Sequence, residues 1–81
     1  MDALQIAREY KAMEADALGQ LVTSGASLSV EIIADVKERL AVRRSWVCTI
    51  ILSGYGKASK EERRELRAAV DLVNSPGIGA F

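Results

Sequence analysis

The 81-residue chain lacks histidine altogether and contains a single cysteine, Cys48. Without histidine, the commonest general base and the usual catalytic triads are missing. A lone cysteine has no partner for an intrachain disulfide and, without histidine, falls short of the ligands of a tetrahedral zinc site. Cys48 is better explained as a small buried apolar residue than as a reactive thiol. These absences predict a protein that is not an enzyme and that holds no metal or cofactor.

Proline and aromatic residues are scarce as well, with one proline, one tryptophan, two tyrosines and one phenylalanine. The core must therefore be built mainly from alanine, leucine, isoleucine and valine. Scarce proline together with abundant alanine, leucine, glutamate and arginine favours helix over sheet. A chain of this length has room for one domain with a modest core, which a partner or a second subunit commonly supplements. We therefore expect a small all-α domain.

An excess of either charge and a long apolar run are both missing. The eleven basic residues balance eleven acidic ones, which gives no overall attraction to nucleic acid or to an anionic membrane. The longest nearly apolar run, Trp46–Leu52, is far shorter than the ~20 residues that cross a bilayer. Residues 1–16 carry charges throughout, unlike the apolar centre of a signal peptide. We expect a cytoplasmic protein that does not bind membranes.

Apolar residues at spacings of three and four predict three helices. A short loop between the first two favours an antiparallel hairpin at about 2–23 and 28–53, clasped by a third helix at about 59–74. Residues 1–76 then form a single helical domain, and 77–81 form a short apolar tail. The expected apolar stripes are Ile6, Tyr10, Met13, Ala17 and Leu21, then Ile33, Val36, Leu40, Val47 and Ile51, and finally Leu66, Ala69, Val70 and Val73.

Capping residues are expected at the start of each helix. Asp2 suits the first helix, and Ser27 or Ser29 suits the second. Ser59, followed three residues later by Glu62, has the spacing of a capping box. The third helix therefore has the clearest start signal in the chain.

Gly54 and Gly56 precede Lys57 in an order that suggests part of a phosphate-binding loop. That loop requires the pattern G-x-x-x-x-G-K-[ST]. Here Ile51 and Ala58 occupy the first and last required positions, so both positions fail. One of the two glycines is better explained as the C-cap of the second helix. No nucleotide site is therefore predicted.

The end of the second helix, Trp46–Leu52, admits two interpretations. It is rich in β-branched residues and could be a buried strand, paired with another subunit because the chain has no second strand candidate. A polar line nevertheless continues along this segment to its end, formed by Glu31, Asp35, Glu38, Ser45, Thr49 and Ser53. Helix is therefore the favoured interpretation.

Arg43 and Arg44 interrupt the apolar side of the second helix, and burying two unpaired guanidinium groups there would be costly. They could pair with acids of the first helix such as Glu14 or Asp16, or extend to the surface. They could also mark the edge of an interface with an acidic partner, or a kink there could rotate the two halves of the helix. We favour pairing within the chain.

The apolar side around Trp46 is wider than one neighbouring helix covers, which indicates a partner surface. We expect a non-enzymatic helical interaction module, oligomeric or completed by a helical partner, such as a small adaptor, an assembly or secretion chaperone, or a phage or virulence accessory protein. In the alternative, the third helix and the tail cover these side chains. The candidate interface residues are Arg43, Arg44, Trp46, Val47, Ile50, Ile51, Tyr55 and Phe81.

A second hypothesis is a small transcriptional regulator that binds nucleic acid through the third helix. Its candidate contacts are Lys57, Lys60, Arg63, Arg64 and Arg67. Against it, the connection before this helix is longer than a helix-turn-helix turn, and Glu61 and Glu62 would face the phosphates. The neutral overall charge argues in the same direction. We therefore favour a solvated face of mixed charge.

Overall fold

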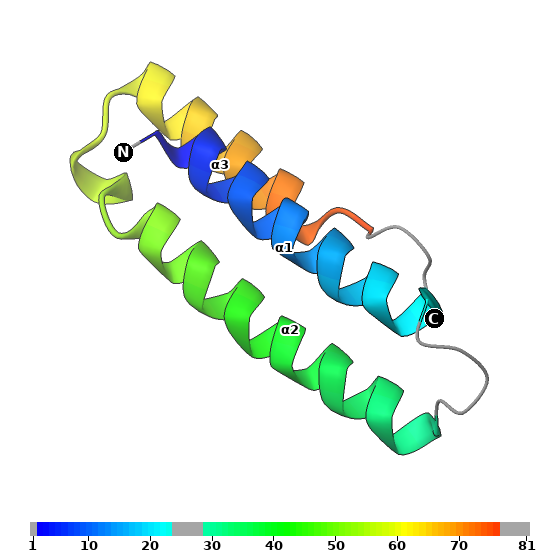
Figure 1. The fold of residues 1–81 in the computed structure, drawn as a ribbon. Coiled ribbons are helices and arrows are strands. Elements are labelled where there is room, and N and C mark those ends of the chain that lie inside the picture. Colours follow the sequence, from blue (N-terminus) through cyan, green and yellow to red (C-terminus); the bar gives the residue numbers. More distant parts are fainter. Residues whose placement is uncertain (1, 24–28, 77–81) are drawn as a thin grey trace.

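A computed structural model describes residues 2–23 and 29–76 of the chain. It contains the helices α1 (Ala3–Thr23), α2 (Val30–Leu52) and α3 (Lys60–Asn74), with a short 3₁₀ turn, η1 (Tyr55–Lys57), between the last two. α1 and α2 are antiparallel, and α3 returns beside them in the direction of α1 (Figure 1). The described residues contain no strand, and Trp46–Leu52 is helical. The prediction of an all-α three-helix domain is confirmed.

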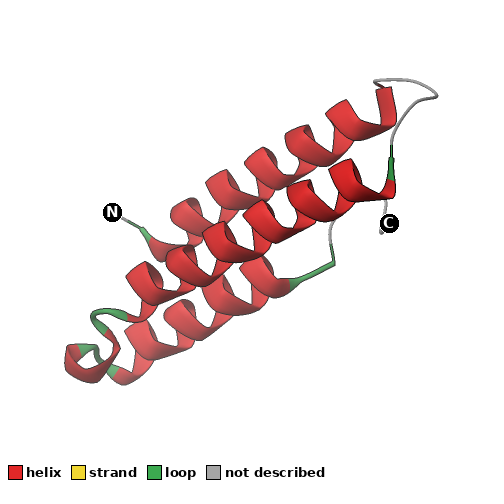
Figure 2. Ribbon diagram, turned by 90° about the horizontal axis from the view of Figure 1, so that it is seen from below, coloured by secondary structure: helices red, strands yellow, loops and turns green. Residues whose placement is uncertain are grey.

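The three helices lie side by side in an elongated bundle of 50 × 18 × 16 Å (Figure 2). α3 is the shortest, with 15 residues against 21 and 23, so it covers only one end of the α1–α2 hairpin. It packs more extensively on α1 than α2 does. Ala7 of α1 and Ala69 of α3 are both fully buried in the same cluster. Their small side chains let these two helices approach closely.

The core accordingly divides into two clusters. All three helices contribute to the first, which consists of Ala7, Tyr10, Val47, Ile51, Ala69 and Val73. Only α1 and α2 contribute to the second, which consists of Leu18, Leu21 and Leu40. One end of the bundle is therefore a three-helix core and the other a two-helix seam.

Each helix begins at a side-chain cap, as expected. The carboxylate of Asp2 accepts a hydrogen bond from the Leu4 N–H at 3.2 Å. Ser29, rather than Ser27, caps α2, and its hydroxyl accepts from a backbone N–H of the first turn. The capping box of α3 is confirmed: Ser59 Oγ accepts from Glu62 N at 3.2 Å, and Glu62 Oε1 accepts from Ser59 N at 3.4 Å. Such caps satisfy backbone donors that have no partner within the helix.

The predicted glycine C-cap of α2 is wrong. Ser53 is the C-cap, and its N–H donates to the Ile50 carbonyl at 3.2 Å. Gly54 has φ −99°, outside the left-handed region that favours glycine. The chain tightens into η1 instead of reversing at a left-handed residue, because an i→i+3 bond ends the helix.

The polar line of α2 is solvent-exposed along its whole length, as expected. It consists of Glu31, Asp35, Glu38, Ser45, Thr49 and Ser53. Among the described residues, no helix combines the length and the apolar character that a bilayer-spanning segment needs.

Candidate functional site

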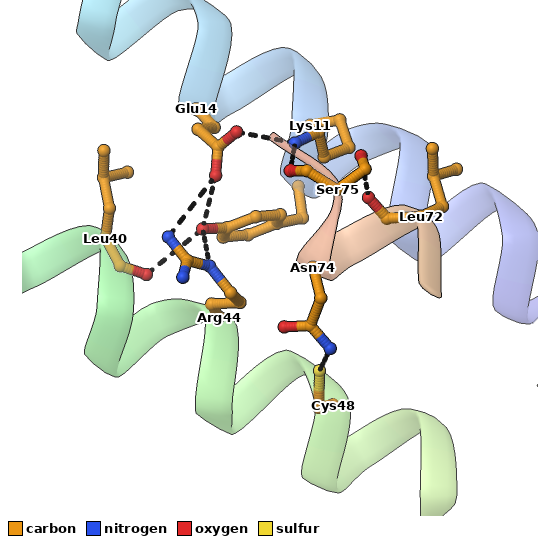
Figure 3. A network of polar contacts seen from close by, with 9 residues as sticks. Lys11, Glu14, Leu40, Arg44, Cys48, Leu72, Asn74 and Ser75 are labelled. Atoms are coloured by element: carbon orange, nitrogen blue, oxygen red, sulfur yellow. Dashed lines mark hydrogen bonds and ion pairs between the residues drawn. The ribbon is translucent and has the colours of Figure 1, made fainter. Parts of the chain in front are cut away.

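A network of polar side chains joins the three helices around Tyr10, which is only 4% exposed (Figure 3). Its hydroxyl oxygen lies 2.9 Å from Glu14 Oε2 and 3.2 Å from the Leu40 carbonyl oxygen. Arg44 Nε donates to the same hydroxyl at 3.3 Å. A phenol has one hydrogen to donate, and the nearer, charged Glu14 oxygen is the stronger acceptor. Tyr10 thus donates to Glu14 within α1 and is joined to α2 by the hydrogen bond that it accepts from Arg44.

Glu14 is buried, with 4% exposure, and two cations neutralise its carboxylate. Lys11 Nζ lies 2.7 Å from Glu14 Oε1, and Arg44 Nη2 lies 3.8 Å from Glu14 Oε2. Lys11 also donates to the Ser75 carbonyl at 2.7 Å, at the C-terminal end of α3, where a cation suits the helix dipole. The prediction that Arg43 and Arg44 pair with acids of the first helix is confirmed for Arg44, whereas Arg43 is exposed and lies over Trp46. A buried charge that is paired and hydrogen-bonded in this way avoids most of its desolvation cost.

Burial raises the pKa of the Tyr10 phenol, and the hydrogen bond from Arg44 opposes this rise. The neighbouring Glu14 carboxylate adds to it, because a negative charge disfavours a second one. The hydrogen bond to Tyr10 in turn raises the pKa of Arg44, which stays charged. A neutral phenol between a paired carboxylate and a permanent cation holds helices together. It is poorly suited to acid–base chemistry near neutral pH.

A second feature is a line of exposed apolar side chains on α2, at Val42, Trp46 and Ile50, here called the α2 ridge. Their exposed fractions are 67%, 57% and 39%. Residues four apart lie on one face of a helix, and this face points away from the core positions Leu40 and Val47. The sequence predicted Trp46 and Ile50 as partner contacts. It missed Val42, although the same spacing would have found it.

Two arginines flank the α2 ridge. The guanidinium carbon of Arg43 lies 5.7 Å from the centre of the Trp46 ring, within the range of a cation–π contact. Arg39 forms an ion pair with Asp35 at 3.1 Å. Both arginines line two adjoining open hollows. One hollow is completed by Asp35, Glu38, Val42 and Trp46, and the other by Met13, Ala17, Val36 and Leu40.

Other candidate interface residues lie elsewhere. Val47 and Ile51 are 7% and 4% exposed within the three-helix core, so they are unavailable to a partner. They lie on the stripe of α2 that faces α1 and α3, where the apolar spacing had also placed them. Arg44 belongs to the Tyr10 network, Tyr55 is half-buried at η1, and Phe81 lies outside the described residues.

Two of the basic residues that were predicted to contact nucleic acid form hydrogen bonds with the connection between α2 and α3. Arg63 donates to the carbonyl oxygens of Tyr55 and Gly56, both at 3.1 Å, and Arg67 donates to the Tyr55 hydroxyl at 2.7 Å. Both guanidinium groups also lie over the Tyr55 ring, at 5.3 and 5.6 Å. The other three candidates, Lys57, Lys60 and Arg64, are exposed.

Cys48 is half-buried beside the three-helix core, where its sulfur accepts a weak hydrogen bond from Asn74 Nδ2 at 3.9 Å. This position suits a small apolar residue. Within residues 2–23 and 29–76, no three cysteine, aspartate or glutamate side chains gather in a way that could hold a metal ion.

Comparison with protein-family models, curated proteins and solved structures finds no match for this chain. The residues themselves therefore carry the functional argument. The Tyr10 network is internal and structural, whereas the α2 ridge and its arginines face solvent. The ridge is the candidate functional site.

Proposed function

We propose that the protein is a non-enzymatic helical interaction module that binds a helix of a partner protein through the α2 ridge. The observation that carries this proposal is the line Val42–Trp46–Ile50, three large apolar side chains exposed by 67%, 57% and 39%. Single exposed apolar residues are common and need no explanation. A continuous line of them, with a tryptophan at its centre and an arginine beside it, has the composition of a protein–protein contact.

The geometry of the ridge suits a helical partner. Side chains at positions i, i+4 and i+8 form one of the ridges that pack into the grooves of a second helix. From Val42 to Ile50 the line spans roughly 12 Å, or about two helical turns. This is the usual way in which an amphipathic helix is recognised by a helical surface. An adaptor in the cytoplasm, an assembly or secretion chaperone, or a phage or virulence accessory protein would use such a surface.

Site-specific photo-crosslinking in the native cells tests this proposal. A photoreactive amino acid is placed at Val42, on the ridge, and separately at its neighbour Ala41, which is also exposed but points about 100° away around the helix. We expect a discrete protein adduct from position 42 and none from position 41. Equal adducts from both positions, or none from either, would contradict the proposal.

Binding of nucleic acid has weaker support. An open hollow on α3 is lined by Ala58, Lys60, Arg63, Arg64 and Arg67. The helix itself carries four basic and four acidic residues, so it offers phosphates no net positive charge. This alternative predicts binding to duplex DNA that weakens steeply with added salt. A gel-retardation assay at low salt that shows no shifted band would remove it.

A further inference from the structure

We propose that the open hollow on α3 binds a compact phosphate ligand, a diphosphate that is either free or part of a nucleotide. The hollow has a volume of about 540 Å³, a size typical of small-molecule sites, and is lined by Ala58, Lys60, Arg63, Arg64 and Arg67. Four of these five residues are cations, and no aspartate or glutamate is among the described residues that line it. The hollow lies on a different helix from the α2 ridge, so this inference and the proposed function can fail independently.

The acidic residues of α3 do not cancel this positive charge where it gathers. The helix is neutral as a whole, with four basic and four acidic residues. Lys60, Arg64 and Arg67 follow one another at spacings of four and three, which places them on one face. Glu61 and Glu65 directly follow two of these cations and therefore point about 100° away around the helix. The hollow is thus a local concentration of positive charge on a neutral helix.

Two of the four cations are held in place by the chain itself. Arg63 donates through Nε and Nη2 to the carbonyl oxygens of Tyr55 and Gly56, both at 3.1 Å. Arg67 donates through Nε to the Tyr55 hydroxyl at 2.7 Å, and both guanidinium groups lie over the Tyr55 ring. A guanidinium group has five N–H donors, so these bonds leave three on Arg63 and four on Arg67 for a ligand. Because both groups are already positioned, little conformational entropy is lost when an anion binds them.

The other two cations can adapt to a ligand. The side chains of Lys60 and Arg64 are exposed and have no hydrogen-bond or ion-pair partner within residues 2–23 and 29–76. Like charges that gather without a carboxylate repel one another, and an anion placed between them relieves this repulsion. Arginine suits phosphate especially well, because its planar group donates two parallel hydrogen bonds to two oxygens. Two fixed and two adaptable cations therefore make a site for a phosphate ligand.

The extent of the cluster favours a short ligand. From Lys60 to Arg67 the helix rises roughly 10 Å, and Asp71 continues the same face one turn beyond Arg67. A longer polyanion along this face, such as a nucleic-acid backbone, would meet that carboxylate. A single phosphate, with roughly −1.5 to −2 charges at pH 7, matches only about half of the positive charge in the hollow. Two linked phosphates match it more closely and reach more of its donors.

Isothermal titration calorimetry of the purified full chain with sodium pyrophosphate tests this inference, at constant ionic strength and without divalent cations. We expect one pyrophosphate per chain, bound at least about tenfold more tightly than inorganic phosphate, because the longer ligand accepts more charge-assisted hydrogen bonds. Titration with ADP identifies the source of the diphosphate. Binding as tight as that of pyrophosphate indicates a nucleotide, and clearly weaker binding indicates the free diphosphate.

Arg64→Gln is the most informative variant, because among the described residues the Arg64 side chain has no partner that the substitution would remove. We expect it to weaken pyrophosphate binding at least about tenfold. Arg64→Lys, which keeps the charge but not the paired donors, should weaken binding less. The matched control is Arg8→Gln, which removes an equal charge from an exposed position on α1 and should leave binding unchanged. Helical content by circular dichroism verifies that each variant folds.

Three results would overturn the inference. Absence of binding at millimolar pyrophosphate would remove the site. Equal weakening by Arg64→Gln and Arg8→Gln would mean that the overall charge of the chain, and not the hollow, attracts the anion. Duplex DNA that binds more tightly than pyrophosphate, and that loses affinity with the same Arg64→Gln substitution, would assign this surface to nucleic acid instead.

Discussion

At the scale of single residues, Tyr10 gives the bundle a specific dependence on alkaline pH. Its folded pKa is raised, first by burial. Its stabilising contribution is therefore complete below the ordinary tyrosine pKa of about 10 and is lost as the pH rises through the higher folded value. Tyr10→Phe lacks this contribution. In urea unfolding from about pH 8 to about pH 11, the difference in unfolding free energy between the two proteins should shrink. A difference that stays constant would show that the phenol does not titrate differently in the fold.

Glu14 should be the most sensitive of the charged residues. Glu14→Ala leaves Lys11 and Arg44 beside a buried site without their carboxylate, and we expect a loss on the order of 2–3 kcal/mol in unfolding free energy. The contact with Lys11, at 2.7 Å, is closer than that with the half-exposed Arg44, at 3.8 Å, and the substitution also removes the acceptor of the Tyr10 hydroxyl at 2.9 Å. The matched control is Glu9→Ala, on the same helix but exposed, which should change stability by less than about 0.5 kcal/mol. Equal effects of the two substitutions would argue against a stabilising network.

At the scale of the helix, the capping box of α3 should contribute measurably because this helix is the shortest of the three. Ser59→Ala removes the acceptor of the Glu62 N–H, and we expect a loss of about 1 kcal/mol in unfolding free energy. Ser45→Ala is the control, since Ser45 is an exposed serine inside α2, where alanine is the better helix former. Chemical denaturation of both variants provides the comparison. A destabilisation by Ser45→Ala as large as that by Ser59→Ala would show that the cap itself contributes little.

The helices and their starts could be predicted from the sequence because their signals are local: apolar spacing and capping residues. The sequence could not predict which side chains of each helix are buried and which are exposed. On α1 the buried set includes Ala7, Glu14 and Leu18, beside the expected stripe, because α1 contacts two helices and periodicity does not tell on which side α3 packs. Likewise, the apolar spacing of α2 does not tell which of Arg43 and Arg44 points towards α1. Only the position of Glu14 on the facing helix decides that Arg44 turns inward, and no local rule places a carboxylate in a core.

At the scale of the whole molecule, stability is expected to differ between the two ends. Val47 and Ile51, near the C-terminal end of α2, pack in the cluster shared by all three helices. Leu40 packs in the cluster of α1 and α2 alone. Fewer packed neighbours mean a smaller free energy of local opening. The α2 ridge therefore extends from the end of the bundle with the three-helix core towards the end with the two-helix seam.

Hydrogen exchange can resolve this difference. Amides of residues 33–38 should exchange faster than those of 46–51, although both segments lie in the same continuous helix. Leu40→Ala should accelerate exchange in 33–38 and leave 46–51 nearly unchanged, because it removes packing only from the two-helix seam. Val73→Ala, at a fully buried position of the three-helix core, should cost about 2 kcal/mol and accelerate both segments. Uniform exchange along α2 in the unmodified chain, or a uniform response to Leu40→Ala, would mean that the bundle opens as one unit despite its uneven packing.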